Sequence, residues 1–594
     1  MLLIRHRDVS YDKDIKKRIL LNRGIAAAAY KDYLSADLTK VNSPLLLGEE
    51  KLKQGLNMLT THINNNSRIL IVVDSDCDGY TSAALLYNYL FNLYPEYSEN
   101  NIDFYLHPGK EHGLSDCLPI ALKYNLVICP DAATNDIEQH KILTDNNVDL
   151  LVLDHHEVDV VSPFGCIINS QLTEYPNKDF SGVGVTWQFC RYMDIILNTS
   201  YSNNYLDLVA LGNIGDMMSM ISIETKAVVF EGLKPANIKN PFIYAMSEKQ
   251  SFSLNKGDYQ PSRENGLKFT PMGAAFFIVP FINAVVRSGN PQEKELIFHS
   301  MLNDRAYNLI PSTKRGEKGK GIEETLVDQA IRTCVNVKNR QTKAENAGLE
   351  LLEEQIYSKD MLNKHKVLLF TLEQEEIDKN IAGLVANKLM NKYQRPVAVL
   401  LKYGQEYRGS ARGYNTDFNF KELCKQHNIA FAAGHAMAFG LGISAQDIEK
   451  FQKDIDNDYK GLDGSQYYYI DHCWDTPESI DKQIILDIAD MNDYWGKDLD
   501  RSLVCVKNIK IIQENLQIMK ANTIKINLPN KISLIKFNGT DEEVDIFKNQ
   551  EVTINVVCKC CINEWGGEVN PQLQMVAYDI IEKKDKILTD LWNF

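Results

Sequence analysis

The sequence predicts a multidomain α/β protein with a mostly parallel β-sheet in its first half. From about residue 68, apolar runs of strand length alternate with helical segments: RILIVVD, TSAALLYNYLFNLY, IDFYLH, LVICPD and VDLLVLD. The chain has 594 residues, which is more than a single hydrophobic core supports. We therefore expect roughly three or four domains.

The order of these patterns predicts where each domain lies. We expect a helical lead-in at residues 1–67, the parallel-sheet domain at 68–320 and a proline-free connecting helix at 321–360. A smaller α/β unit follows at 361–450, with VLLFTL, IAGLVANKLMNKY and RPVAVLL, and then a linker region at 451–499. Short strands separated by turn residues occupy 500–594, which predicts a small OB-like β-barrel.

Composition limits the function classes. Hydrophobic residues make up 44% of the chain and charged residues 24%, as in ordinary globular proteins. We find neither a signal peptide nor an uninterrupted apolar run of about 18 residues, so we expect a cytoplasmic protein without a membrane partner. The net charge of −15 argues against a broad basic surface for nucleic acid, although a narrow groove can still be positive.

The twelve cysteines form no regular framework, so we expect reduced thiols. Zinc at Cys558, Cys560 and Cys561 is disfavoured, because their spacing alternates between the faces of a strand and no partner pair is evident.

Acidic residues follow several predicted strands at the point where each strand ends. They are Asp74, Asp76 and Asp78 in IVVDSDCDGYTS, Asp131 in LVICPD, and Asp154 with His155 and His156 in LVLDHH; Asp216 follows an apolar helical run. Ligands bind at the carboxyl ends of strands in open parallel sheets. Neighbouring carboxylates repel one another, and a divalent cation relieves that repulsion.

The mixture of carboxylates and imidazoles favours manganese over magnesium, with magnesium possible, and several bridging carboxylates indicate two ions. For the first motif alone, a solvated acidic loop is an equally good interpretation. The other clusters favour a two-metal site, and two metals indicate phosphoryl chemistry.

Together these motifs resemble the DHH phosphoesterase superfamily, and within it the RecJ-like single-stranded-DNA-specific exonucleases. The resemblance rests on DxDxDGxTS at 74–82, Asp131, the DHH triplet at 154–156 and Asp216. It implies the following metal ligands: Asp76, Asp78, Asp131, His155 and Asp216, with Asp131 bridging two ions. Asp74 is a further candidate ligand, because Val72 stands where RecJ-type members often have a histidine. His156 and Asp131 are the expected catalytic residues, with His156 facing the scissile phosphate.

The resemblance extends to candidate substrate-binding residues. PFINAVVRSG implies Asn283 and Arg287, and the DHH-associated domain motifs RGSARG and AAGHAMAFG imply Ser410, Arg412, Gly434 and His435. Lys110 in HPGKEHGL and Trp565 in the β module are further candidates for nucleic-acid binding.

The function implied is 5′ to 3′ hydrolysis of single-stranded DNA, with a single-strand-binding protein or helicase as a candidate partner. One alternative is a DHH phosphodiesterase that acts on short oligonucleotides, cyclic dinucleotides or polyphosphate. The other is a non-catalytic relative that binds single strands.

Overall fold

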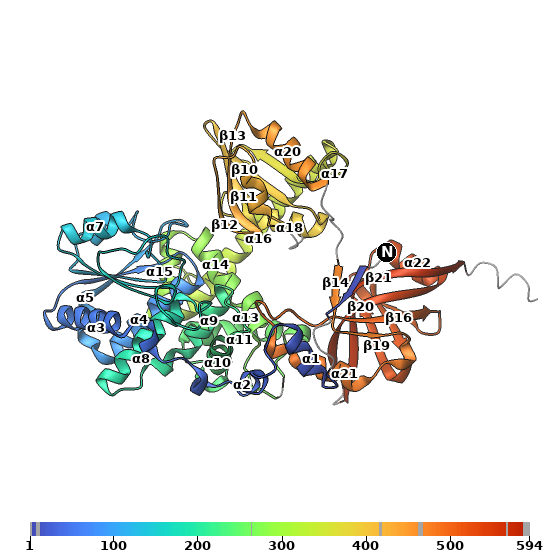
Figure 1. Ribbon diagram of the computed structural model, residues 1–594, viewed down its shortest axis with the longest axis horizontal. Coiled ribbons are helices and arrows are strands. Elements are labelled where there is room, and N and C mark those ends of the chain that lie inside the picture. Colours follow the sequence, from blue (N-terminus) through green and yellow to red (C-terminus); the bar gives the residue numbers. More distant parts are fainter. Residues whose placement is uncertain are drawn as a thin grey trace, which may run out of the picture. The chain divides into compact units, whose positions relative to one another are not determined.

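The computed structural model describes residues 3–7, 12–262, 264–414, 419–460, 467–565 and 568–585 (Figure 1). The chain divides into two compact units, Met1–Cys334 with Tyr467–Phe594, and Val335–Gln466. The second unit is thus an insertion in the first. The predicted connecting helix is confirmed as α16 (Leu326–Ser358), which begins in the first unit and ends in the second.

A five-stranded parallel sheet forms the centre of the first unit. Its order is β3 (Ile102–Leu106), β2 (Ile69–Val73), β4 (Leu126–Pro130), β5 (Asp149–Asp154) and β6 (Cys166–Asn169). The sequence predicted the first four strands. It missed β6, because four residues are too short a run to stand out.

Helices cover both faces of this sheet (Figure 1). One face packs against α3 (Glu49–Asn64), α4 (Cys77–Leu93) and α8 (Gly182–Leu197), and the other against α6 (Leu118–Ala121) and α7 (Ile137–Asp145). Burial on both faces explains why the strand sequences are continuously apolar. Because β2, β4 and β5 run parallel, the polar residues that follow them lie at one edge of the sheet.

Further helices complete the part of the first unit that contains the parallel sheet: α9 (Leu206–Gly215), α10 (Ile223–Gly232), α13 (Pro271–Phe277), α14 (Val279–Ser288) and α15 (Pro291–Ser300). Pro271–Ser288 is apolar and long enough to pass a length and composition test for a membrane span, with mean hydropathy 1.4 over 18 residues, although Asn283 and Arg287 interrupt it. The stretch is broken at Ile278 into α13 and α14, with a proline in the first turn of α14, and half of it is buried. We therefore interpret it as a pair of core helices.

The end of the chain forms a seven-stranded sheet with α22 (Asp541–Asn549). Its strands, in sheet order, are β15 (His472–Trp474), β16 (Val504–Ile511), β20 (Gln550–Trp565), β21 (Glu568–Asp585), β19 (Ile532–Lys536), β18 (Thr523–Leu528) and β17 (Leu516–Met519). All twelve cysteines have free thiols, and Cys558, Cys560 and Cys561 are buried on β20.

The lead-in is not wholly helical. β1 (Leu3–His6) pairs in parallel with β14 (Tyr467–Ile470), which joins the beginning of the chain to the segment that precedes the β module. Arg23, which follows α1 (Ile15–Asn22), forms a buried bidentate ion pair with Asp471. A strand of four residues carries too weak a pattern to be predicted without its partner.

The second unit is a mixed sheet in the order β12 (Phe431–His435), β13 (Ala438–Ser444), β11 (Glu406–Arg412), β10 (Val397–Tyr403) and β9 (Leu368–Leu372). One core cluster includes residues of α18 (Ala382–Tyr393), and another includes Phe451 and Ile455 of α20 (Ile448–Lys460). Because α20 packs in this core, we propose that the domain predicted at 361–450 extends to residue 460.

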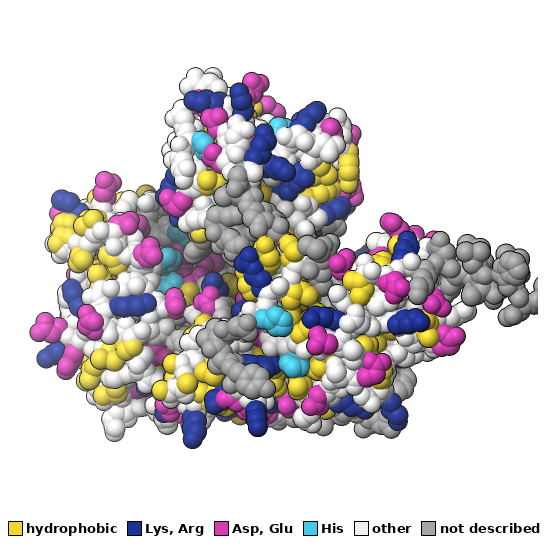
Figure 2. All heavy atoms as spheres, turned by 45° about the vertical axis from the view of Figure 1, so that its right-hand side comes forward, with side chains coloured by type: hydrophobic (Ala, Val, Ile, Leu, Met, Phe, Trp, Pro, Cys, Tyr) yellow, Lys and Arg dark blue, Asp and Glu magenta, His cyan; other side chains and the backbone are white. Residues whose placement is uncertain are grey.

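Acidic and basic side chains are interspersed on the face drawn in Figure 2. Among the residues coloured there, no broad basic area is visible, in keeping with the net charge of −15.

Candidate metal centre

The first acidic motif lies in the turn between β2 and α4. Asp76 caps α4, since its Oδ1 accepts a hydrogen bond from the backbone N–H of Gly79 at 3.0 Å. Asp74 and Asp78 are almost fully buried. A Cβ on Gly79 would lie 2.5 Å from the Cβ of Asp74, so only glycine fits there. The tight strand-to-helix turn therefore places three carboxylates at one end of the sheet.

Asp131 follows β4 in a left-handed conformation, with φ at 69°. Its backbone N–H donates to the carbonyl of Leu153 at 2.8 Å, which fixes the residue beside the end of β5. A Cβ on Gly182, the first residue of α8, would lie 2.2 Å from Asp131 Oδ1. This glycine therefore provides the space that the carboxylate occupies.

The start of α8 also holds Asp78. The carboxylate of Asp78 accepts hydrogen bonds from the backbone N–H groups of Gly182 at 2.7 Å and Val183 at 3.1 Å. A helix N-terminus favours a negative charge at this place. A Cβ on Gly212 of α9 would lie 2.3 Å from Asp78 Oδ1, and Asp216 follows the end of the same helix.

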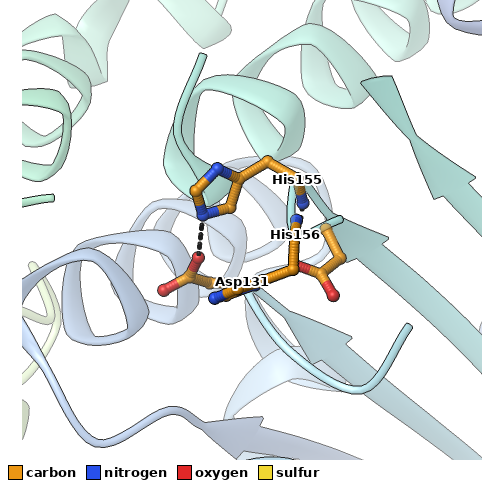
Figure 3. Close-up of side chains that lie close together, drawn as sticks. Asp131, His155 and His156 are labelled. Atoms are coloured by element: carbon orange, nitrogen blue, oxygen red, sulfur yellow. Dashed lines mark hydrogen bonds and ion pairs between the residues drawn. The ribbon is translucent and has the colours of Figure 1, made fainter. Parts of the chain in front are cut away.

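The two adjacent histidines after β5 have different environments. The His155 ring is directed at Asp131 (Figure 3), with 3.3 Å between Nε2 and Oδ1. Its Nε2 also lies 3.4 Å from Asp216 Oδ2. The His156 side chain is 57% exposed, and its Nδ1 lies 2.8 Å from Asp154 Oδ1. Asp154 is fully buried and accepts further hydrogen bonds from backbone N–H groups, so it anchors the motif.

Burial and mutual repulsion shift the pKa values of these groups. Burial, with Asp78 and Asp76 nearby, raises the pKa of Asp216 to about 8, and burial raises that of Asp78 to about 6. Burial lowers the pKa of His155 to about 4, which keeps a neutral ring with a lone pair for a metal. The hydrogen bond with Asp154 raises the pKa of His156 to about 9, so this ring carries a positive charge at neutral pH.

The arrangement fits divalent cations. Ligand atoms within 4.8 Å of one another form the groups Asp78, His155 and Asp216, and Asp74, Asp76 and Asp131; a third group contains Asp131, Asp154, His155 and His156. In the described part of the chain, three buried atoms of this cluster have no hydrogen-bond partner: Asp74 Oδ1, Asp131 Oδ1 and His155 Nε2. Unpartnered buried polar atoms are costly, and a bound cation would satisfy them.

The structure adds one residue that the sequence analysis missed. His112, in the loop after β3, has its Nδ1 2.7 Å from Asp74 Oδ2. Its position after the carboxyl end of a strand was the available signal, but in that loop the sequence analysis named only Lys110. Lys110 is exposed in the same loop. Val72 is buried in the core beside α6 and α7, so its position contributes no ligand.

The other predicted residues of the first unit lie on α14, which packs against α4 and α9. Asn283 is partly buried, and its Oδ1 is another buried atom without a partner among the described residues. Arg287 lies one turn further along and is also partly buried.

In the second unit, Ser410 and Arg412 lie on β11, and a Cβ on Gly383 would lie 2.7 Å from Arg412 Nη2. Gly434 has φ at 120°, a conformation that favours glycine. Arg412 and His435 both pair with Ala438 of the strand between them. The side chains of His435 and Trp565 are outside the described part of the structure.

Comparison with known proteins agrees with this architecture. Residues 68–213 match the DHH family N-terminal domain, 364–461 the DHHA1 domain and 475–577 the RecJ OB domain. The chain is 30% identical over 602 residues to a putative SPbeta prophage-derived single-strand DNA-specific exonuclease, YorK, of Bacillus subtilis, covering 98% of each chain. The chain belongs to the RecJ branch of the DHH family.

More distant RecJ proteins are also similar. The single-stranded-DNA-specific exonuclease RecJ of Haemophilus influenzae is 24% identical over 479 residues, which cover 76% of each chain. The fold matches a structure of RecJ from Thermus thermophilus in complex with Mn²⁺, with a TM-score of 0.71 and 17% identity. That match covers 95% of this chain and 76% of the other. The predicted order of a DHH domain, a connecting helix, a DHH-associated domain and an OB module is thus confirmed.

Proposed function

We propose that this chain is a divalent-metal-dependent exonuclease that hydrolyses single-stranded DNA from the 5′ end. The observation that carries the proposal is the buried cluster of carboxylates and one neutral imidazole, with ligand atoms that the protein itself leaves unpartnered. The printed names of its relatives, single-strand DNA-specific exonucleases, support the substrate.

The proposed cofactor is a pair of Mn²⁺ ions, with Mg²⁺ as a substitute. Asp78, His155 and Asp216 would hold one ion, and Asp74, Asp76 and Asp131 the other. Asp131 is the proposed bridge, because its Oδ1 also lies 3.3 Å from His155 Nε2. The mixture of oxygen and nitrogen ligands supports manganese.

Bound cations would supply Lewis acidity and a water of lowered pKa for attack on the phosphodiester. The positively charged His156, held at Nδ1 by Asp154, is exposed and binds a non-bridging phosphate oxygen. Asn283 and Arg287 approach the substrate from α14.

In the second unit the proposed phosphate-binding residues are Ser410, Arg412, Gly434 and His435. Arginine beside a glycine backbone suits phosphate recognition. Lys110 and Trp565 are proposed contacts to the rest of the strand.

The decisive experiment follows a long single strand labelled at either end, with and without Mn²⁺, for the wild type and Asp131→Asn. We expect metal-dependent release of the 5′ label as mononucleotide by the wild type, and a rate about 10²–10³-fold slower in the variant. Cleavage of dinucleotides alone would instead indicate the small-substrate phosphodiesterase. Tight binding of single strands without any cleavage would indicate the non-catalytic relative.

We further propose that the protein acts in the cytoplasm, where a helicase or a single-strand-binding protein presents the strand. Co-purification of such a protein with the tagged chain would test this. Loss of that protein after nuclease treatment would indicate contact through DNA, and its retention would indicate direct contact.

A further inference from the structure

We propose that His112 is a positioning residue of the metal centre, which holds one oxygen of Asp74 so that the other faces the cation. The inference rests on the metal-dependent function proposed above. His112 comes from the loop between β3 and α6, and therefore from none of the acidic motifs.

The contact with Asp74 uses one carboxylate oxygen and leaves the other open. His112 Nδ1 lies 2.7 Å from Asp74 Oδ2, and the Asp74 side chain is only 3% exposed. Asp74 Oδ1 is buried and has no hydrogen-bond partner within the described ranges, and Asp74 groups with Asp76 and Asp131 as potential ligands. A partner behind a ligating carboxylate orients it and tunes its affinity for the metal.

A buried lysine fixes the loop before His112. Lys294 of α15 is 2% exposed, and its Nζ donates hydrogen bonds to the carbonyls of His107 at 3.0 Å, Pro108 at 2.9 Å and Gly109 at 3.0 Å. These three bonds use every hydrogen of the ammonium group. Moving the loop would therefore leave a buried charge without partners, which is costly.

A carboxylate fixes the loop after His112. The backbone N–H of Leu114 donates to Asp136 Oδ2 at 2.7 Å. Gly113 has φ at 70°, and a Cβ there would lie 2.2 Å from the same oxygen. Because the chain is held on both sides of His112, the fold fixes the position of the ring beside Asp74.

The test measures Mn²⁺ affinity on the full chain without DNA, from the electron paramagnetic resonance signal of free Mn²⁺. We expect His112→Leu to bind Mn²⁺ about 10–100-fold more weakly. We expect His112→Asn to recover most of the loss, since its amide nitrogen can donate where Nδ1 does. Lys294→Met should also weaken Mn²⁺ binding, because it releases the loop that carries His112.

His62 provides a matched control in the same unit. Its Nε2 lies 2.9 Å from Asp149 Oδ2, at the beginning of β5 and hence at the opposite end of the strand from His155. His62→Leu should leave Mn²⁺ affinity unchanged, and metal-free His112→Leu should unfold at the wild-type temperature.

Mn²⁺ affinity of His112→Leu equal to that of the wild type would overturn the inference, and so would an equal loss in His62→Leu. Equal losses in His112→Leu and His112→Asn would also overturn it, because the ring itself would then be required. A wild-type chain that takes up no Mn²⁺ would overturn the metal centre as a whole. A chain that binds Mn²⁺ but cuts no strand would overturn only the proposed exonuclease.

Discussion

Two buried clusters of charged groups in the first unit differ in whether the chain itself supplies partners for all their buried polar atoms. Arg23 donates to Asp471 through two nitrogens, at 2.7 and 2.8 Å, and to the carbonyl of Asp500 at 2.9 Å. Both side chains of this pair are at most 1% exposed. In the metal centre the Asp131 side chain is 2% exposed and that of His155 9%, yet Asp131 Oδ1 and His155 Nε2 have no hydrogen-bond partner in the described residues.

The difference shows what each cluster is for. A buried charge with all its partners in the same chain fastens two segments, and it needs nothing from outside. A buried cluster of like charges destabilises the fold until a ligand arrives, and such a cost is typical of functional sites. Three measurements test this contrast.

The largest expected effect is on the completed pair. Arg23→Met leaves the Asp471 carboxylate buried without a charged partner, with the side-chain amide of Asn22 as a weak remaining donor at 3.4 Å, so we expect the free energy of unfolding to fall by about 3–5 kcal/mol. Chemical denaturation of the metal-free chain measures it. The double variant Arg23→Met, Asp471→Leu should regain much of this loss, because no charge remains buried. A loss below about 1 kcal/mol in the single variant would contradict the fastening role.

The next effect belongs to the incomplete cluster. Mn²⁺ at about 100 times its Kd should stabilise the chain by about 2.7 kcal/mol for each site, which thermal unfolding detects as a higher Tm. The shift should vanish in Asp131→Asn and persist in Arg23→Met. A shift of equal size in Asp131→Asn would place the bound ion elsewhere.

The smallest effect is the repulsion within the metal-free cluster. Burial and neighbouring carboxylates raise the pKa of Asp216 to about 8. Because the folded state then binds a proton more tightly than the unfolded state, ionising Asp216 opposes folding increasingly as pH rises from about 4 to about 8. Full linkage of this shift would amount to about 5 kcal/mol, but the Asp216 side chain is 32% exposed and solvent screens its repulsion. Metal-free Asp216→Asn should therefore be more stable than the wild type at pH 8.5 by on the order of 1 kcal/mol, and equally stable near pH 4. Urea denaturation at both pH values checks this; a difference independent of pH would contradict it.

Much of the fold followed from the sequence because parallel strands covered on both faces require continuous apolar runs. β2, β4 and β5 show such runs, and each is followed by an acidic motif. The carboxyl ends of parallel strands meet at one edge, so the clustering of Asp131 with His155 could be expected from order alone.

The supporting contacts could not be predicted, because they join segments far apart in the chain. The need for glycine at the first residue of α8 is one example: a Cβ on Gly182 would lie 2.2 Å from Oδ1 of Asp131, which belongs to another segment. The position of His112 after the carboxyl end of β3 placed its loop near the acidic motifs, but its contact with Asp74 also depends on Lys294 and Asp136, which lie far away in the chain.

The ion pair of Arg23 with Asp471 has a consequence for the order of synthesis. Its partners are 448 residues apart, and the second unit lies between them in the chain. At about 5–20 residues per second, a ribosome needs roughly 20 to 90 s to travel from one to the other. During that interval the nascent chain exposes an arginine and a lone strand, β1, whose partners do not yet exist. We expect a ribosome-bound intermediate in which the inserted unit is already folded while the unit that surrounds it still awaits its last segment.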